Sequence, residues 1–283
     1  MTRVEIEQIL GGVRANHSSR NAAQLSNSLA HLKRLAVEAG DQAEAKGIWC
    51  LEQALEAQEK YLAAFASMKS GKFYAGWCAM ERTETPIYWL QPHLPWRPER
   101  FELEFIRTTV KKLQSIFPYK YFVSPEFLEG KKTCSICDKT VSIRTSCGHQ
   151  VGEIYNGEMC ERKVHGLEVL GMALVTSPAQ KYSVPFSTDP ATGEQKDHYN
   201  YSLVQYLIRR LESPFDDWTV EWTKRRHPHS RYNFVGRNEK CPCESDKKYK
   251  KCCLPEAGVL RPHVQFGFKK PLPAELATIE YSN

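Results

Sequence analysis

Cysteine is the residue type most able to do chemistry in this chain. The 283 residues include ten cysteines, and eight of them fall in two short segments, 134–160 and 241–253. The first ten residues, MTRVEIEQIL, contain acidic groups where an export signal needs an apolar stretch. We therefore expect a cytoplasmic protein in a reducing compartment. In such a compartment, clustered cysteines indicate metal sites rather than disulfides.

The C-terminal segment has the pattern C-x-C, eight residues, then C-C, and its donors are Cys241, Cys243, Cys252 and Cys253. Pro242 limits the conformations of the turn within the first pair. A tetrahedral zinc site needs four soft donors of this kind, and the neighbouring lysines favour their thiolate form. We therefore expect a zinc ion here. Iron is the alternative, because four thiolates suit either metal.

The same segment resembles a known motif. Residues 236–254 read GRNEKCPCESDKKYKKCCL, which is similar to the SEC-C motif, the zinc-binding module at the C-terminus of the preprotein translocase motor SecA. The resemblance implies that the four cysteines hold the metal and that the basic surface binds SecB-like chaperones or ribosomes. The basic residues of that surface are Arg237, Lys247, Lys248, Lys250 and Lys251. The chain has no G-x-x-x-x-G-K-[ST] loop, so the resemblance extends to a module and not to an ATPase.

Two positions depart from the motif. Glu244 and Asp246 stand where members of the motif family usually have glycine. Because glycine reaches positive φ at no steric cost, we expect a tighter or more strained turn here. Aspartate tolerates the left-handed region better than most residues, so Asp246 is the milder change.

The central segment offers five possible metal ligands. Cys134 and Cys137 form a C-x-x-C half-site, Cys147 and His149 follow as C-x-H, and Cys160 lies further on. Our preferred set is Cys134, Cys137, Cys147 and His149, with Cys160 as the replacement for one member. A C-x-x-C pair could also be a redox dithiol, but the third cysteine and the C-x-H pair favour metal. Four protein donors make a closed, structural site, so we expect two zinc ions per chain.

The net charge of +6 is concentrated in one part of the chain. Between Lys224 and Lys251, ten Lys or Arg residues face three acids, which gives +7 there and about −1 elsewhere. A basic strip this local attracts RNA, a ribosome surface or an acidic protein. The alternative to docking on a protein or ribosome is therefore a nucleic-acid-binding zinc protein that uses the strip 224–251.

The elements that must position these groups follow from the apolar periodicity. Residues 1–116 place apolar side chains at helix spacing and predict a helical bundle, with Asn21 capping one helix and Gly40 ending it. The last helix is expected over 99–116. Aromatic residues between 71 and 97 indicate core packing rather than a stacking surface.

The sequence pattern changes from helix-type to strand-type after residue 116. Strand-type runs around one helix at 199–211 predict a mixed domain over 117–223. We expect a basic linker and the zinc module over 224–255. The residues 256–283 are expected to form an extended arm or a mobile tail.

The predicted fold class is therefore α+β, with an N-terminal helical bundle, a central zinc-ribbon-like mixed domain and a small C-terminal SEC-C zinc knob. Nucleophile and base signatures such as G-x-S-x-G and H-E-x-x-H are missing from the sequence, so an enzyme is not the favoured interpretation. The longest apolar run spans about seven residues, and a membrane span needs about 20. We predict a metal-stabilised bacterial adaptor that docks on a protein or ribosome.

Overall fold

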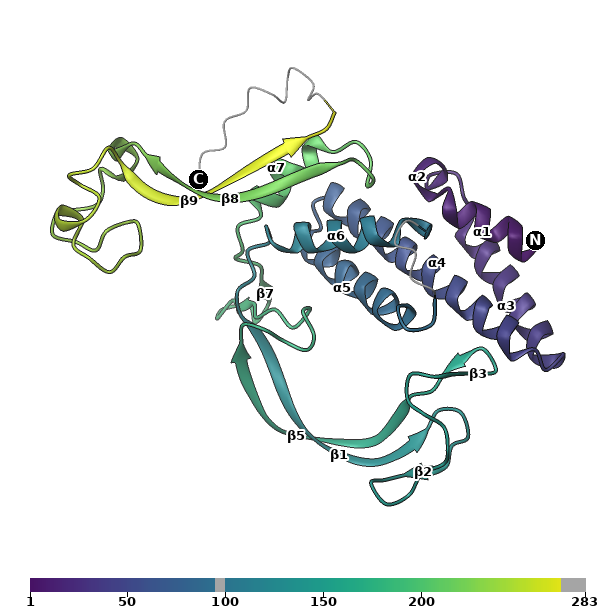
Figure 1. The fold of residues 1–283 in the computed structure, drawn as a ribbon. Coiled ribbons are helices and arrows are strands. Elements are labelled where there is room, and N and C mark those ends of the chain that lie inside the picture. Colours follow the sequence, from purple (N-terminus) through teal and green to yellow (C-terminus); the bar gives the residue numbers. More distant parts are fainter. Residues whose placement is uncertain (95–99, 271–283) are drawn as a thin grey trace. The chain divides into compact units, whose positions relative to one another are not determined.

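The computed structural model describes residues 1–94 and 100–270. It divides into two compact units, Met1–Arg209 (unit 1) and Arg210–Asn283 (unit 2), and each is described by itself. Helices and small antiparallel sheets both occur, which confirms the α+β class (Figure 1). No helix of the described residues is long and apolar enough to cross a membrane.

The first part of unit 1 is helical, as predicted. Its helices are α1 Arg3–Gly11, α2 Val13–Asn16, α3 Ala22–Glu38, α4 Gln42–Lys69, α5 Phe73–Leu90 and α6 Leu103–Gln114, and the short 3-10 helix η1 Arg100–Glu102 precedes α6. The Asn21 side chain caps α3 by accepting from the Gln24 N–H, and Gly40 follows the end of α3 with φ of 70°. Both predicted helix signals are confirmed. Residue 99, where the last helix was expected to begin, lies outside the described residues.

Helix α4 contributes the most to the core of the bundle. Ile48, Leu51 and Tyr61 on its inner face are almost completely buried. Gln58 is buried among them, and its side-chain amide donates to the Leu10 and Phe101 carbonyls at 2.9 Å each. Because both amide protons find acceptors, this polar group is accommodated in the core and ties α1 and η1 to α4.

A second core layer is aromatic. The Trp77 ring contacts Phe117, Tyr119 and Phe122 with centroid distances of 4.8–6.1 Å, and its indole N–H donates to the Lys181 carbonyl at 2.6 Å. The aromatics at the start of the segment 71–97 therefore pack in the core, as predicted. Residues 95–97 of that segment lie outside the described residues.

A long two-stranded ribbon follows the helices. Strand β1 Phe122–Cys134 pairs antiparallel with β5 Arg162–Val175, from Phe122 opposite Val175 to Cys134 opposite Arg162. Three short strands lie near its far end: β2 Thr140–Val141 pairs with β1, and β3 Ile154–Tyr155 pairs with β4 Glu158–Met159. Residues 187–196 form a small hairpin, β6 Ser187–Thr188 with β7 Gln195–Lys196. Helix α7 Ser202–Arg210 occupies the helical region expected at 199–211.

Unit 2 is built on another ribbon. Strand β8 Trp218–His227 pairs antiparallel with β9 Val259–Phe268, and the 3-10 helices η2 His229–Tyr232 and η3 Tyr249–Lys251 lie between them. The region expected to be an extended arm or mobile tail thus contains a paired strand over 259–268. Residues 271–283 of that region lie outside the described residues. In both units, a cysteine group is carried between the two strands of an antiparallel ribbon.

Candidate metal centres

The four thiols of the C-terminal module converge. The sulfur atoms of Cys241, Cys243, Cys252 and Cys253 all lie within 4.8 Å of one another. Cys243 Sγ is 3.4 Å from Cys252 Sγ, which is 3.9 Å from Cys253 Sγ. In a tetrahedral zinc site with Zn–S bonds of about 2.3 Å, the sulfurs are about 3.8 Å apart. The donor set therefore fits one metal ion of this kind.

A short hairpin and a helical turn bring the two thiol pairs together. The Cys241 N–H donates to the Lys247 carbonyl at 2.7 Å, and the Tyr249 N–H donates to the Glu239 carbonyl at 2.8 Å. The turn η3 then redirects the chain, so that the adjacent Cys252 and Cys253 approach the first pair. These backbone hydrogen bonds bring thiols that are distant in the sequence of the motif close together in space.

The module has a small core of its own. Tyr249 and Val259 are buried with Cys241 and Cys253. The Tyr249 hydroxyl lies 2.5 Å from His229 Nδ1, and the other ring nitrogen of His229 lies 2.8 Å from the Glu256 carbonyl. These contacts fix the position of Tyr249, which packs against the buried thiols of the cluster.

Both departures from the motif adopt the conformation that glycine would take. Glu244 has φ of 62° and Asp246 has φ of 59°, which confirms the expected strain in this turn. The Arg261 guanidinium donates to the Glu244 carboxylate at 2.6 Å and to the Pro242 carbonyl at 2.5 Å. Lys240 donates to the Asp246 carboxylate at 2.8 Å. These ion pairs partly offset the backbone strain, and Arg261, which lies on β9, was missed because nothing in the sequence links it to the turn.

The thiols of this cluster have unlike acidities. A hydrogen bond with the Ser245 hydroxyl, assisted by neighbouring thiols, lowers the pKa of Cys243 to about 6. Burial raises the pKa of Cys253 to about 12 and also raises the pKa of Cys241. A divalent cation would reverse this burial penalty, because thiolates around it are neutralised by its charge.

The basic residues of the module point into solvent. Five of its cationic side chains belong to exposed residues, and within the described residues they make no ion pair: Arg237, Lys247, Lys248, Lys250 and Lys251. Two of them, Lys250 and Lys251, lie on η3 directly before the second thiol pair. The thiol cluster therefore fixes the part of the chain that presents the positive charge.

The central segment forms a second cluster. The ligand atoms of Cys134, Cys137, Cys147 and His149 all lie within 4.8 Å of one another, and Cys134 Sγ is 3.7 Å from His149 Nδ1. This is the set that the sequence analysis preferred. Three thiols and one imidazole match the donors of a structural zinc site.

A knuckle turn at the end of β1 positions the first thiol pair. The Cys134 N–H donates to the Lys139 carbonyl at 3.0 Å, and the Asp138 N–H donates to the Cys134 carbonyl at 2.9 Å. The Ile136 N–H points to Cys134 Sγ at 3.4 Å. Burial raises the pKa of Cys134, but backbone N–H groups and the nearby thiols outweigh it and lower the pKa to about 6.

Cys160 is buried beside this cluster without belonging to the four. Its sulfur lies 3.8 Å from Cys134 Sγ. Arg162 donates to Cys160 Sγ at 3.3 Å and to the His149 carbonyl at 3.0 Å, so one guanidinium bridges the fifth thiol and the imidazole residue. The sequence reasoning missed Arg162, although its place two residues after a candidate ligand was a usable signal. His165 on β5 lies outside the four donors, and its ring nitrogen Nε2 is 2.8 Å from the Thr133 hydroxyl on β1.

Other chemically able groups lie apart from both clusters. Cys50 is buried in the helical bundle, and burial raises its pKa to about 11, so it is a packing residue rather than a thiolate.

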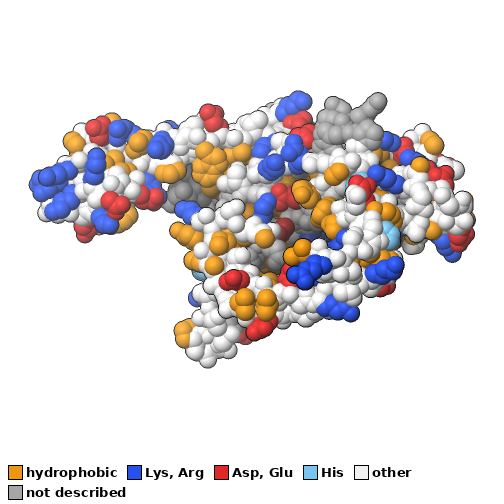
Figure 2. Space-filling model, turned by 60° about the horizontal axis from the view of Figure 1, so that its bottom comes forward, with side chains coloured by type: hydrophobic (Ala, Val, Ile, Leu, Met, Phe, Trp, Pro, Cys, Tyr) orange, Lys and Arg blue, Asp and Glu red, His pale blue; other side chains and the backbone are white. Residues whose placement is uncertain are grey.

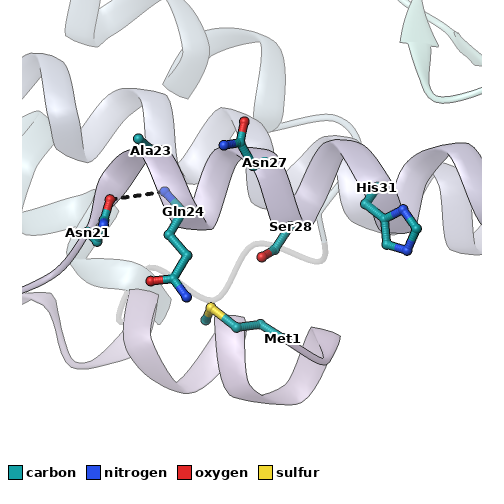
Figure 3. A pocket seen from close by; sticks show the side chains of 7 residues that line it. All are labelled: Met1, Asn21, Ala23, Gln24, Asn27, Ser28 and His31. Atoms are coloured by element: carbon teal, nitrogen blue, oxygen red, sulfur yellow. Dashed lines mark hydrogen bonds between the residues drawn. The ribbon is translucent and has the colours of Figure 1, made fainter.

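A surface hollow of about 440 Å³ lies between the N-terminus and α3 (Figure 3). Its lining is mainly neutral and polar and contains no member of either thiol cluster: Met1, Asn21, Ala23, Gln24, Asn27, Ser28 and His31.

The fold and the two clusters define a mixed α+β protein with two groups of donors that could each hold a metal ion. The family model of the SEC-C motif matches residues 237–255. The chain therefore carries a SEC-C motif, and the motif coincides with the thiol cluster of unit 2. No solved structure matches the chain.

Proposed function

We propose that this protein is a zinc-stabilised bacterial adaptor whose SEC-C module docks on an acidic surface of a chaperone or ribosome. The observation that carries the proposal is the placement of five exposed cations on a segment whose conformation depends on four converging thiols. Like charges this close repel one another, so an opposing acidic surface would stabilise their arrangement. The match to the SEC-C motif supports the same interpretation.

We assign zinc to both clusters because three or four thiols with at most one imidazole are its usual structural ligands. The central cluster then acts as a zinc-ribbon-like clamp that closes the end of the β1–β5 ribbon. In the C-terminal cluster the ion would neutralise the buried thiols and hold η3 in place. Metal-bound rather than disulfide-bonded cysteines are typical of a cytoplasmic protein, and we propose that location.

Charge reversal in the module tests the docking proposal. The variant replaces Lys248, Lys250 and Lys251 by Glu, and binding is measured by co-sedimentation with purified bacterial ribosomes and by interferometry with purified SecB chaperone. We expect capture of at least one of these probes by the native chain and loss of at least about tenfold in affinity for the variant, because several charge contacts reverse sign.

A matched control separates docking from general charge effects. Lys72, Lys120 and Lys196 are exposed residues outside the module, and their replacement by Glu changes the net charge by the same amount. This control should bind like the native chain. Equal weakening by both variants, or the absence of binding to both probes, would contradict the proposal.

A second candidate function is single-stranded nucleic acid binding through the same basic strip. Phe234 is 81% exposed and Trp222 is 50% exposed, and Arg225, Arg231 and Arg237 are exposed residues of the same unit. Exposed aromatic rings among cations are a stacking platform for bases. Phe234→Ala should then weaken binding to a labelled oligonucleotide, and affinity should fall steeply with salt because phosphate contacts release counterions. A chaperone interface would not require Phe234.

A further inference from the structure

One face of the β1–β5 ribbon is apolar and exposed. Cross-strand partners lie on the same face of a sheet and successive residues alternate, so the register assigns the paired side chains to two faces. A register shift between Glu126 and Phe127 leaves Leu170 outside the pairing and keeps Val169 and Met172 on the same face. The face that contains Phe127 carries six exposed apolar residues from the two strands: Pro125, Phe127, Leu167, Val169, Met172 and Leu174. The five largest of them are 45–76% exposed. Figure 2 brings forward the lower part of the view in Figure 1, where β1 and β5 lie, and hydrophobic side chains are visible there on the surface.

The opposite face of the ribbon is different in character. It carries Glu126, Glu168 and Lys132, together with Gly171 and Ala173. On the apolar face, by contrast, no charged side chain occurs within 123–127 or 169–174. Charge begins only towards the far end, at Glu129 and beyond. The apolar face is thus an uncharged stretch with charge at its far end only, which is the character of a protein–protein interface core rather than of a phosphate-binding surface.

Contacts with the helical bundle hold the ribbon at its two ends (Figure 1). At its base, the Phe122 ring stacks on Trp77 of the bundle. At its far end, the turn between β3 and β4 returns to the helices: Gln42 on α4 makes two hydrogen bonds to Asn156 at 2.6 and 2.9 Å, and Lys33 on α3 pairs with Glu158 at 2.8 Å. An isolated two-stranded sheet is only marginally stable in water. The anchored ends therefore hold the ribbon in place, and within the described residues its apolar face stays exposed.

We propose that a second copy of this chain covers the apolar face, so that the protein is a dimer in which two ribbons pack face to face. The five large side chains expose on the order of 500 Å², which is near the upper limit for a patch on a monomer. Two such faces would bury on the order of 1,000 Å² in total, which is the lower bound of a specific interface.

The geometry of the ribbon suits its own copy. Two twisted sheets pack about 10 Å apart with their strands nearly aligned, and a twofold axis through the centre would place each Met172 and Val169 against the partner face. Such an isologous contact needs only one self-complementary patch, which is why twofold dimers are the commonest assemblies. The uncharged centre matches the apolar core typical of homodimer interfaces.

Substitution on the two faces of the ribbon tests the proposal. The full chain is examined by sedimentation velocity over a concentration series, and we expect a dimer. The double variant Val169→Lys, Met172→Lys places charges at the centre of the interface and should raise the dissociation constant by at least about 100-fold, because desolvating unpaired charges is costly. Both side chains are exposed in the single chain, so the variant should keep its helical circular dichroism and metal content.

Leu128→Lys is the matched control. Leu128 is also apolar and 56% exposed, but its register partner Glu168 places it on the opposite face. This variant should dimerise like the native chain. A native chain that stays monomeric up to about 100 μM, where even weak specific dimers form, would overturn the proposal. It would also be overturned by a dimer that survives the double variant, or by equal weakening in Leu128→Lys.

Discussion

Replacing one buried thiol in each cluster should show that the central metal centre stabilises the helical unit and that the C-terminal one does not. Cys134 and Cys241 are suitable for this comparison because their side chains are equally inaccessible, with 0% and 3% exposure. Each is the first metal ligand of its group along the chain, and each lies in a hydrogen-bonded turn. The Cys134 thiol accepts from the Ile136 N–H, and the Cys241 N–H donates to the Lys247 carbonyl. A difference between Cys134→Ser and Cys241→Ser therefore reports on the place of the cluster in the fold.

The magnitude follows from what each cluster holds. The central cluster joins the end of the β1–β5 ribbon to the turn that contacts α3 and α4. Its loss removes these contacts and leaves buried polar groups without partners, for which we take about 3 kcal/mol as a lower bound. In a unit of about 200 residues, 3 kcal/mol lowers the melting temperature by about 6–12 °C. The C-terminal cluster stabilises only the end of the β8–β9 ribbon, so its loss should move the melting of the helices by less than about 2 °C.

The assay uses circular dichroism at 222 nm, because the long helices lie in unit 1, together with elemental analysis of the purified variants. We expect each variant to retain one metal ion and only Cys134→Ser to lower the helix melting temperature. Equal melting temperatures for both variants would refute the assigned difference in structural role. Retention of two ions by either variant would refute the assignment of the replaced thiol as a ligand.

Three further predictions concern the metal and its surroundings. Elemental analysis of protein purified without added metal should give two zinc ions per chain, and a content near zero with ten freely reactive thiols would contradict both sites. Arg261→Ala should speed metal loss to a chelator by about 10–100-fold, because it removes the guanidinium that holds Glu244 and the Pro242 carbonyl; Lys269→Ala is the control. Burial raises the pKa of Cys241 and Cys253, whereas the pKa of Cys243 is lowered to about 6, so as the pH falls protons compete with the metal first at the two buried thiolates and last at Cys243. Metal should therefore be released from the module on acidification, and release that is independent of pH would count against thiolate ligation.

Local features were predictable from the sequence because they depend on short stretches of chain. The helices of unit 1 followed from apolar periodicity and from caps such as Asn21. The left-handed turn at Glu244 and Asp246 followed from the glycines of the motif, since that backbone conformation is imposed by a few neighbouring hydrogen bonds. Thiols that lie two to ten residues apart were likewise expected to converge, because a tight turn is enough to bring them together.

The tertiary structure decided what depends on pairing between distant residues. Strand β9 was expected to be an arm or tail because prolines are scattered through this region, and its pairing with β8 makes it a strand. The position of Arg261 against the motif turn and the contact of Arg162 with the His149 carbonyl also join residues that are distant in the sequence. Residues 169–175 are an apolar run of strand type, yet their register with β1 leaves one apolar face in solvent. Hydrophobicity along the chain indicates which residues favour burial, but the fold determines which of them find a neighbour within the same chain.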